Sequence, residues 1–147
     1  MTYLAPLKDL LFNIEHLAGL DELARLDGFE DAGIETAAAV LEECARFNEE
    51  VIAPLNASGD REPATLVDGV VKTSPGMRQA FRQYAEAGWL GVQHPSEYGG
   101  QGLPKVIGAA CSEMVNSANL SFALCALLSD GAIAALAAVG SEAMRQT

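Results

Sequence analysis

Residues 88–102 read GWLGVQHPSEYGGQG, and this stretch constrains the fold more than any other part of the chain. Its five glycines interrupt any helix or strand, so the chain must change direction here. Such a stretch is either a tight structural corner or a loop that wraps a phosphate. A phosphate loop needs G-x-x-x-x-G-K-[ST], or G-x-G-x-x-G between a strand and a helix, and neither spacing occurs. We therefore interpret residues 88–102 as a corner between two helices.

The residues before this corner are helical in pattern. Apolar side chains recur at helical spacing over residues 6–17, which predicts a short amphipathic helix, and residues 20–26 add another turn or two. Residues 34–51 predict the first long helix, which we expect Pro54 to end. Residues 56–65 are polar and predict a loop.

A hairpin is predicted in ATLVDGVVKTS, residues 64–74. Two β-branched stretches flank Asp68-Gly69, the pattern of a two-residue type I′ turn. Two strands are too few to be stable alone, so we expect the hairpin to lie on the helices.

Further helices flank the corner. Ser74-Pro75 predicts a helix start, with the serine as the cap, and this helix runs to Ala87. Gly88 then stands where a left-handed residue is favoured. Beyond the corner, Pro104 begins a helix that extends to about Asn116.

The most apolar run extends from Leu120 to Val139, in a helix that Asn119 or Ser121 begins. Its length could span a bilayer, but Asp130 lies at its middle and no basic flank follows. We predict a helix buried inside a bundle and no membrane span. Asp130 must then be paired, hydrogen-bonded or protonated, either capping an adjacent turn or facing a cavity.

Composition agrees with an all-α fold. Alanine, leucine and glutamate favour helix, and we predict a bundle of about five or six helices with one small β-hairpin. The net charge of −11 and the absence of a basic cluster argue against nucleic acid and anionic membranes as partners.

Residue chemistry indicates neither a catalytic nor a metal site. Cys44, Cys111 and Cys125 form no CxxC pair, and we expect each to be a buried thiol in a reducing cytoplasm. His16 and His94 lack partners at metal-ligand spacing, and His94 is interpreted as a solvated loop residue. No G-x-S-x-G nucleophile elbow is present.

The order of these elements resembles the amino-terminal helical domain of the flavin-dependent acyl-CoA dehydrogenase family. The similarity covers residues 34–147, and residues 1–33 resemble the leading helical segment of a subgroup similar to the 3-methylmercaptopropionyl-CoA dehydrogenases. Its motif includes the following residues: Gly88, Gly91, Pro95, Glu97, Tyr98, Gly99, Gly100, Gly102, Glu113, Gly131, Gly140, Ser141, Glu142 and Arg145.

This resemblance implies a function for a longer parent protein. The family binds FAD and oxidises the α,β C–C bond of an acyl-CoA thioester to the enoyl-CoA, passing electrons to an acceptor. Its catalytic base and most FAD contacts belong to later domains, so the resemblance assigns no catalytic, cofactor-binding or metal-binding residue here. It implies that Phe122, Ala123, Ala126 and Leu127 line the acyl pocket, at helical spacing on one face. Because the free cysteines fit a reducing cytoplasm and this face could pair with a second copy, we also expect a cytoplasmic homo-oligomer.

Two interpretations follow. In the first, the chain is one domain of such a dehydrogenase, inactive alone, with an unfinished helix at residues 141–147. In the second, it is a stand-alone helical interaction or oligomerisation module without enzymatic activity. The reading frame beyond Thr147 distinguishes them.

Overall fold

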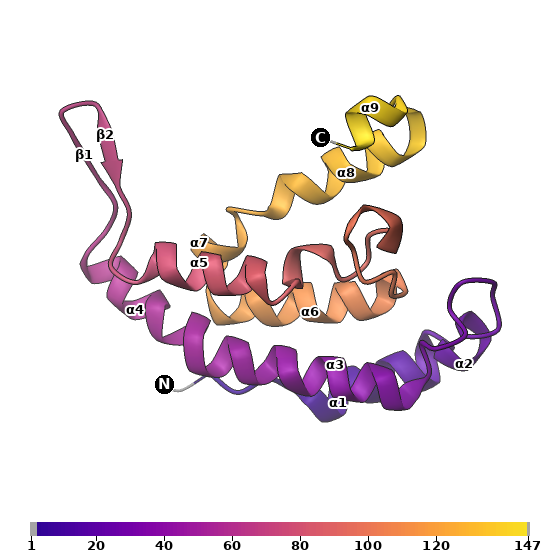
Figure 1. The fold of residues 1–147 in the computed structure, drawn as a ribbon. Coiled ribbons are helices and arrows are strands. Elements are labelled where there is room, and N and C mark those ends of the chain that lie inside the picture. Colours follow the sequence, from indigo (N-terminus) through magenta and orange to yellow (C-terminus); the bar gives the residue numbers. More distant parts are fainter. Residues whose placement is uncertain (1–2, 147) are drawn as a thin grey trace.

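The computed structural model describes residues 3–146 and confirms a helical fold with one two-stranded hairpin (Figure 1). Residues 1–2, the start of the predicted leading segment 1–33, and Thr147, the end of the predicted helix at residues 141–147, lie outside the described residues. The elements are, in order, α1 (Leu7–Phe12), a π-helical turn η1 (Asn13–Leu17), α2 (Leu20–Leu23), α3 (Ile34–Phe47), a π-helical turn η2 (Asn48–Ile52), α4 (Ala53–Arg61), β1 (Thr65–Val67), β2 (Val70–Lys72), α5 (Met77–Glu86), the 3₁₀ turns η3 (Trp89–Gly91) and η4 (Ser96–Tyr98), α6 (Lys105–Ala118), α7 (Leu120–Ala123), α8 (Leu127–Val139) and α9 (Glu142–Arg145).

Two adjoining cores hold these helices together. In the first, Leu10 of α1 and Leu20 of α2 pack with Leu41 of α3 and Ile107 of α6. The leading segment therefore shares its core with the helices that follow it. The second core joins η2, α5, α6 and α7 around Phe122. Burying apolar surface of this kind is the main favourable contribution to folding.

The expected end of the first long helix at Pro54 is wrong. The helical path continues through η2 into α4, where Pro54 occupies the first turn. Proline has no N–H and its ring crowds the carbonyl of residue i−4. The π-helical turn before it redirects the backbone, because Ala53 N–H donates to the carbonyl of Asn48, five residues back. Residues 56–61 are consequently helix and not loop.

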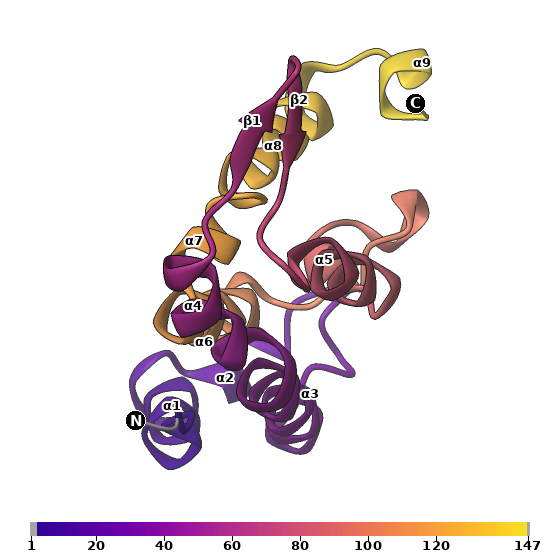
Figure 2. The same cartoon turned by 90° about the vertical axis from the view of Figure 1, so that its left-hand side faces the viewer.

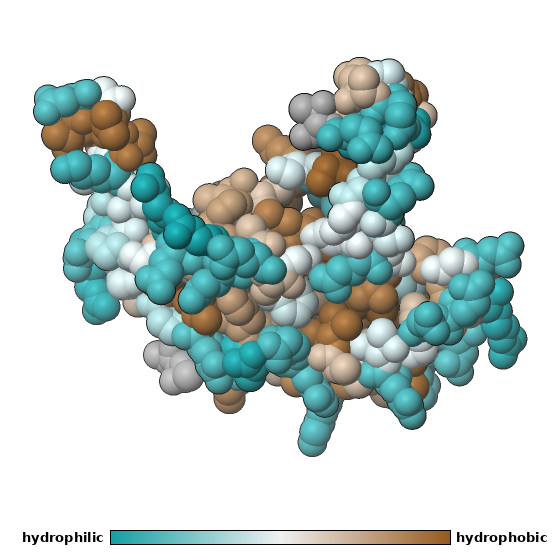
Figure 3. Space-filling model, viewed as in Figure 1, coloured by the Kyte–Doolittle hydropathy of each residue, from teal (hydrophilic) through white to brown (hydrophobic). Residues whose placement is uncertain are grey.

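The hairpin forms with the predicted turn but in an unexpected place. Val67 pairs with Val70, and Asp68 and Gly69 have φ values of 51° and 76°, as a type I′ turn requires. However, the hairpin projects away from the helices (Figures 1 and 2). Both of its faces are exposed, including Leu66 at 71%, and apolar residues lie on the surface of the projecting hairpin (Figure 3). The expectation that it lies on the helices is therefore wrong.

Helix α5 begins later than Ser74-Pro75 predicts. Its N-cap is Gly76, at φ 81°, and no side chain caps it. Ser74 instead contributes its carbonyl, which accepts from Met77 N–H at 3.2 Å. The helix end is as predicted, with Gly88 at φ 80°.

The predicted continuous helix to Val139 is broken, and its second part is not buried. Asn119 caps α7 by accepting from Phe122 N–H at 3.1 Å, which confirms that predicted start. The chain then turns at residues 124–126 before α8 begins. Packing of Phe122 on Tyr84, at 5.5 Å between ring centroids, keeps α7 in the core. Helix α8 has no buried residue and lies on the side opposite α1 and α3 (Figures 1 and 2).

By length and composition alone, the stretch Leu120–Val139 is apolar enough to cross a membrane, with a mean hydropathy of 2.1, and 11% of it is buried. Among the described residues it is the one such stretch. The turn at residues 124–126 divides it, and the 13 residues of α8 alone reach only about 20 Å, less than the apolar thickness of a bilayer.

Candidate functional site

The loop formed by residues 88–102, called the glycine loop below, is folded on itself. Its backbone N–H groups donate to its own carbonyls: Gly100 to Pro95 at 3.0 Å, Gln101 to Gly91 at 2.8 Å and Gly102 to His94 at 2.9 Å. A phosphate cradle needs such N–H groups free to point at the ligand. The loop is therefore a structural corner, as the spacing predicted, and it does not fit the pyrophosphate of a dinucleotide.

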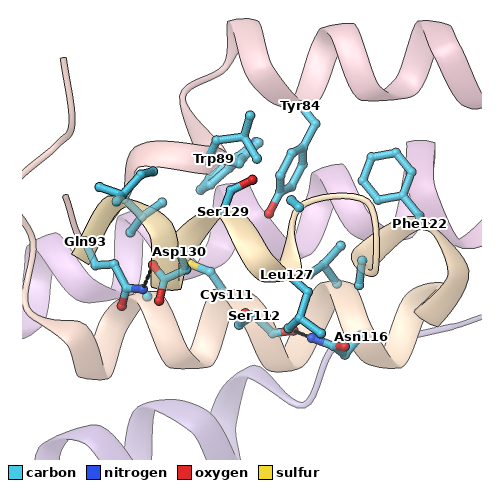
Figure 4. Close-up of a pocket in the computed structure, with 17 residues that line it drawn as sticks. Tyr84, Trp89, Gln93, Cys111, Ser112, Asn116, Phe122, Leu127, Ser129 and Asp130 are labelled. Atoms are coloured by element: carbon cyan, nitrogen blue, oxygen red, sulfur yellow. Dashed lines mark hydrogen bonds between the residues drawn. The ribbon is translucent and has the colours of Figure 1, made fainter. Parts of the chain in front are cut away.

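A cavity of about 240 Å³ lies beside this corner (Figure 4). Tyr84 and Trp89 of the α5–η3 segment form one wall, and Cys111 and Asn116 of α6 form the floor. The third wall comes from α7 and the first turns of α8. Most of this lining is apolar, with a few polar groups among it, which is typical of small-molecule sites.

The structure brings the four predicted pocket residues together. Phe122, Ala123, Ala126 and Leu127 all line the cavity. They do not share one helical face, because the turn at residues 124–126 separates the first two from Leu127. Phe122 and Ala123 are buried in the core, whereas Leu127 is 52% exposed. Contact of these side chains with a ligand stays a prediction.

His94 and Gln93 are the residues that the sequence interpretation missed. His94 is not a solvated loop residue, since its side chain is 14% exposed and its Nε2 lies 3.0 Å from Oδ1 of Asp130. The same Oδ1 accepts a hydrogen bond from Gln93 Nε2 at 2.5 Å (Figure 4). Of the alternatives predicted for Asp130, the structure has it hydrogen-bonded and lining the cavity, but its side chain is 51% exposed and not buried as predicted. Gln93 and Asp130 lie 37 residues apart in sequence, so no local motif reveals their contact.

The pKa is shifted for Tyr84, which lines the cavity, and for Cys44, which contacts the cavity residue Cys111. Burial, and then the thiols of Cys44 and Cys111, raise the pKa of Tyr84. The hydrogen bond to Cys111 and burial raise the pKa of the Cys44 thiol well above its ordinary range. Tyr84 and Cys44 are therefore held neutral. Cys44 and Cys111 are buried as predicted, but Cys125 is exposed because it lies on the turn that leaves the core.

No three histidine, cysteine, aspartate or glutamate side chains gather into a possible metal site within residues 3–146. The indole Nε1 of Trp89 is buried and makes no hydrogen bond to the described part of the chain. It is a donor at the cavity without a protein acceptor.

Comparison with known proteins identifies relatives of this chain. Residues 34–147 match the family described as "Acyl-CoA dehydrogenase, N-terminal domain". The chain is 47% identical over 145 residues to the 3-methylmercaptopropionyl-CoA dehydrogenase of Ruegeria pomeroyi, covering 99% of this chain and 25% of that protein. It is 28% identical over 119 residues to the broad-specificity linear acyl-CoA dehydrogenase FadE5 of Mycobacterium tuberculosis, and this match covers 80% of this chain and 20% of that protein. The chain thus spans 25% or less of the length of these relatives.

Proposed function

The chain belongs to the acyl-CoA dehydrogenase family, and from this membership we propose that it is the amino-terminal domain of an FAD-dependent enzyme. That enzyme oxidises the α,β C–C bond of an acyl-CoA thioester to the enoyl-CoA. Both relatives carry names of enzymes that act on acyl-CoA thioesters. The identity over 99% of the chain supports the same substrate class here.

Within this enzyme, we propose that the chain forms part of the acyl-chain wall. The observation that carries this proposal is the convergence of Phe122, Ala123, Ala126 and Leu127 on one cavity. Phe122 is fixed by ring contacts with Phe81 and Tyr84, at centroid distances of 6.0 and 5.5 Å. A rigid apolar wall favours an acyl chain over water by the hydrophobic effect.

The same residues give no support for catalysis by this chain alone. The glycine loop uses its own N–H groups, so it offers no cradle for the FAD pyrophosphate. FAD would supply the acceptor for the hydride, and its contacts are proposed to lie in the rest of the parent protein. We expect the 147-residue chain to be colourless and inactive. Retention of stoichiometric FAD by this chain would contradict that expectation.

Exposure of α8 supports a role within a larger assembly. Leu128 is 83% exposed and Val139 is 86% exposed. Large apolar surfaces of this kind are normally covered in the working protein. We propose that other domains of the parent protein cover α8. A stand-alone interaction module would use the same surface, and the flavin measurement described at the end of the Discussion separates the two.

The acyl-wall proposal is tested in the protein made from the full reading frame that contains this chain. Leu127→Trp fills the cavity, and we expect it to raise KM for an acyl-CoA about tenfold, the effect of roughly 1.4 kcal/mol of lost binding. Leu66→Trp in the exposed hairpin is the matched control, since Leu66 is remote from the cavity lining. Equal KM values for the two variants would refute the proposed wall.

A further inference from the structure

Helix α8 has few attachments to the rest of the chain although it forms one wall of the cavity. None of its residues is buried, and its backbone enters through the turn at residues 124–126. Segments with little buried apolar surface open locally at low free-energy cost. Among the described residues, polar side-chain contacts therefore do more than core packing to hold α8 against the rest of the chain.

Asp130, in the first turn of α8, supplies the closest polar attachment. Its Oδ1 accepts from Gln93 Nε2 at 2.5 Å and lies 3.0 Å from His94 Nε2, an ion pair when His94 is protonated. The Asp130 side chain is 51% exposed, so solvent reduces the extra strength that a charged acceptor gives to these contacts. A second contact between the same loop and the C-terminal helices, Tyr98 Oη to Glu142 Oε2, is longer at 3.4 Å.

The partners of Asp130 are held firmly on the loop side. The carbonyl of His94 accepts from Gly102 N–H at 2.9 Å, and the carbonyl of Val92 accepts from Leu103 N–H at 3.0 Å. The Gln93 side chain rests on α6 at Gly108, where an added Cβ would lie 2.6 Å from its Oε1. Both donors are thus positioned by the loop's own hydrogen bonds and by α6, whereas α8 has no buried residue.

We propose that Asp130 is a positioning residue that latches α8 onto the glycine loop and so completes the cavity. With the latch closed, Leu127, Ser129 and Ile133 of α8 line the cavity together with Trp89. With the latch open, that wall moves away and Trp89 meets solvent. This role goes beyond the proposed function, because it requires neither FAD nor an acyl-CoA.

Trp89 is the single tryptophan of the chain and lines the cavity, so its fluorescence reports the latch directly. The experiment measures acrylamide quenching of Trp89 in the 147-residue chain without ligand. The test variant is Asp130→Ala and the control is Asp60→Ala, an exposed carboxylate in α4. Asp130→Asn is the rescue variant, because its amide oxygen still accepts from Gln93. Far-UV circular dichroism checks that each variant is folded.

Loss of the two contacts shifts the open-to-closed ratio about fivefold, so we expect Asp130→Ala to raise the quenching constant above that of the parent sequence. The quenching constant of Asp130→Asn should lie between those of Asp130→Ala and the parent sequence, and that of Asp60→Ala should equal the parent value. If Asp130→Ala does not fold, Gln93→Leu removes the neutral donor and gives the same reading. If folded Asp130→Ala or Gln93→Leu has the same Trp89 quenching constant as Asp60→Ala, the proposal is overturned, and this result does not depend on the substrate of the protein.

Discussion

Replacing Gly100 with alanine tests the physical account of the glycine loop. An added Cβ would overlap the carbonyl oxygen of His94 and lie 3.0 Å from the carbonyl oxygen of Gly91. Both obstacles are backbone atoms, which cannot rotate away as a side chain can. The loop must therefore open to admit one methyl group.

The loss of stability can be worked out from the hydrogen bonds that this opening weakens. Moving His94 and Gly91 weakens two backbone hydrogen bonds, from Gly102 at 2.9 Å and from Gln101 at 2.8 Å. Each is worth about 1 kcal/mol net, and overpacking strain adds roughly 1–3 kcal/mol. We expect a loss of about 3–5 kcal/mol in the free energy of unfolding. For a chain of this length that lowers Tm by roughly 10–15 °C.

Thermal unfolding followed by the helical signal in far-UV circular dichroism measures this change in Tm. Gly131→Ala in α8 is the control, because an added Cβ there meets nothing within 4 Å. Alanine favours helix over glycine by about 1 kcal/mol, so the control should not lose stability. A Tm for Gly100→Ala within about 2 °C of that control would refute the close-approach argument.

Two further predictions concern the buried groups. The pKa of Tyr84 is raised by burial above its ordinary value of about 10, so the unfolded chain ionises first and stability falls as pH rises past about 10. Tyr84→Phe should lessen that alkaline loss, measured by urea unfolding on both sides of the transition. Cys125 is the exposed thiol of the three and should react rapidly with a thiol reagent. Cys44 and Cys111 are buried and should react only after unfolding. Fast reaction of all three would contradict the packing of α3 against α6.

The helices and the hairpin turn were predictable because local chemistry decides them. Asn119 caps α7 with its own side chain, and Asp68-Gly69 tolerates the positive φ angles of its turn. Pro54 misled the prediction for a reason that sequence hides. The π-helical turn at Asn48–Ile52 accommodates it, and no local residue pattern marks such a turn.

The position of α8 could not be predicted from its composition. An apolar helix is normally buried, but burial needs a partner, and the described residues provide none for Leu128 or Val139. The latch was hidden for a related reason. Asp130 was recognised as needing a partner, yet only the folded chain brings Gln93 and His94 to it.

The most direct test of the central claim is made on the protein purified from the full reading frame that contains these residues. The account predicts a yellow protein whose flavin absorbance is bleached when an acyl-CoA is added without an electron acceptor. The 147-residue chain, prepared in parallel, should show no such absorbance. A full-length protein that lacks flavin and does not oxidise acyl-CoA thioesters would contradict the assignment as a dehydrogenase domain.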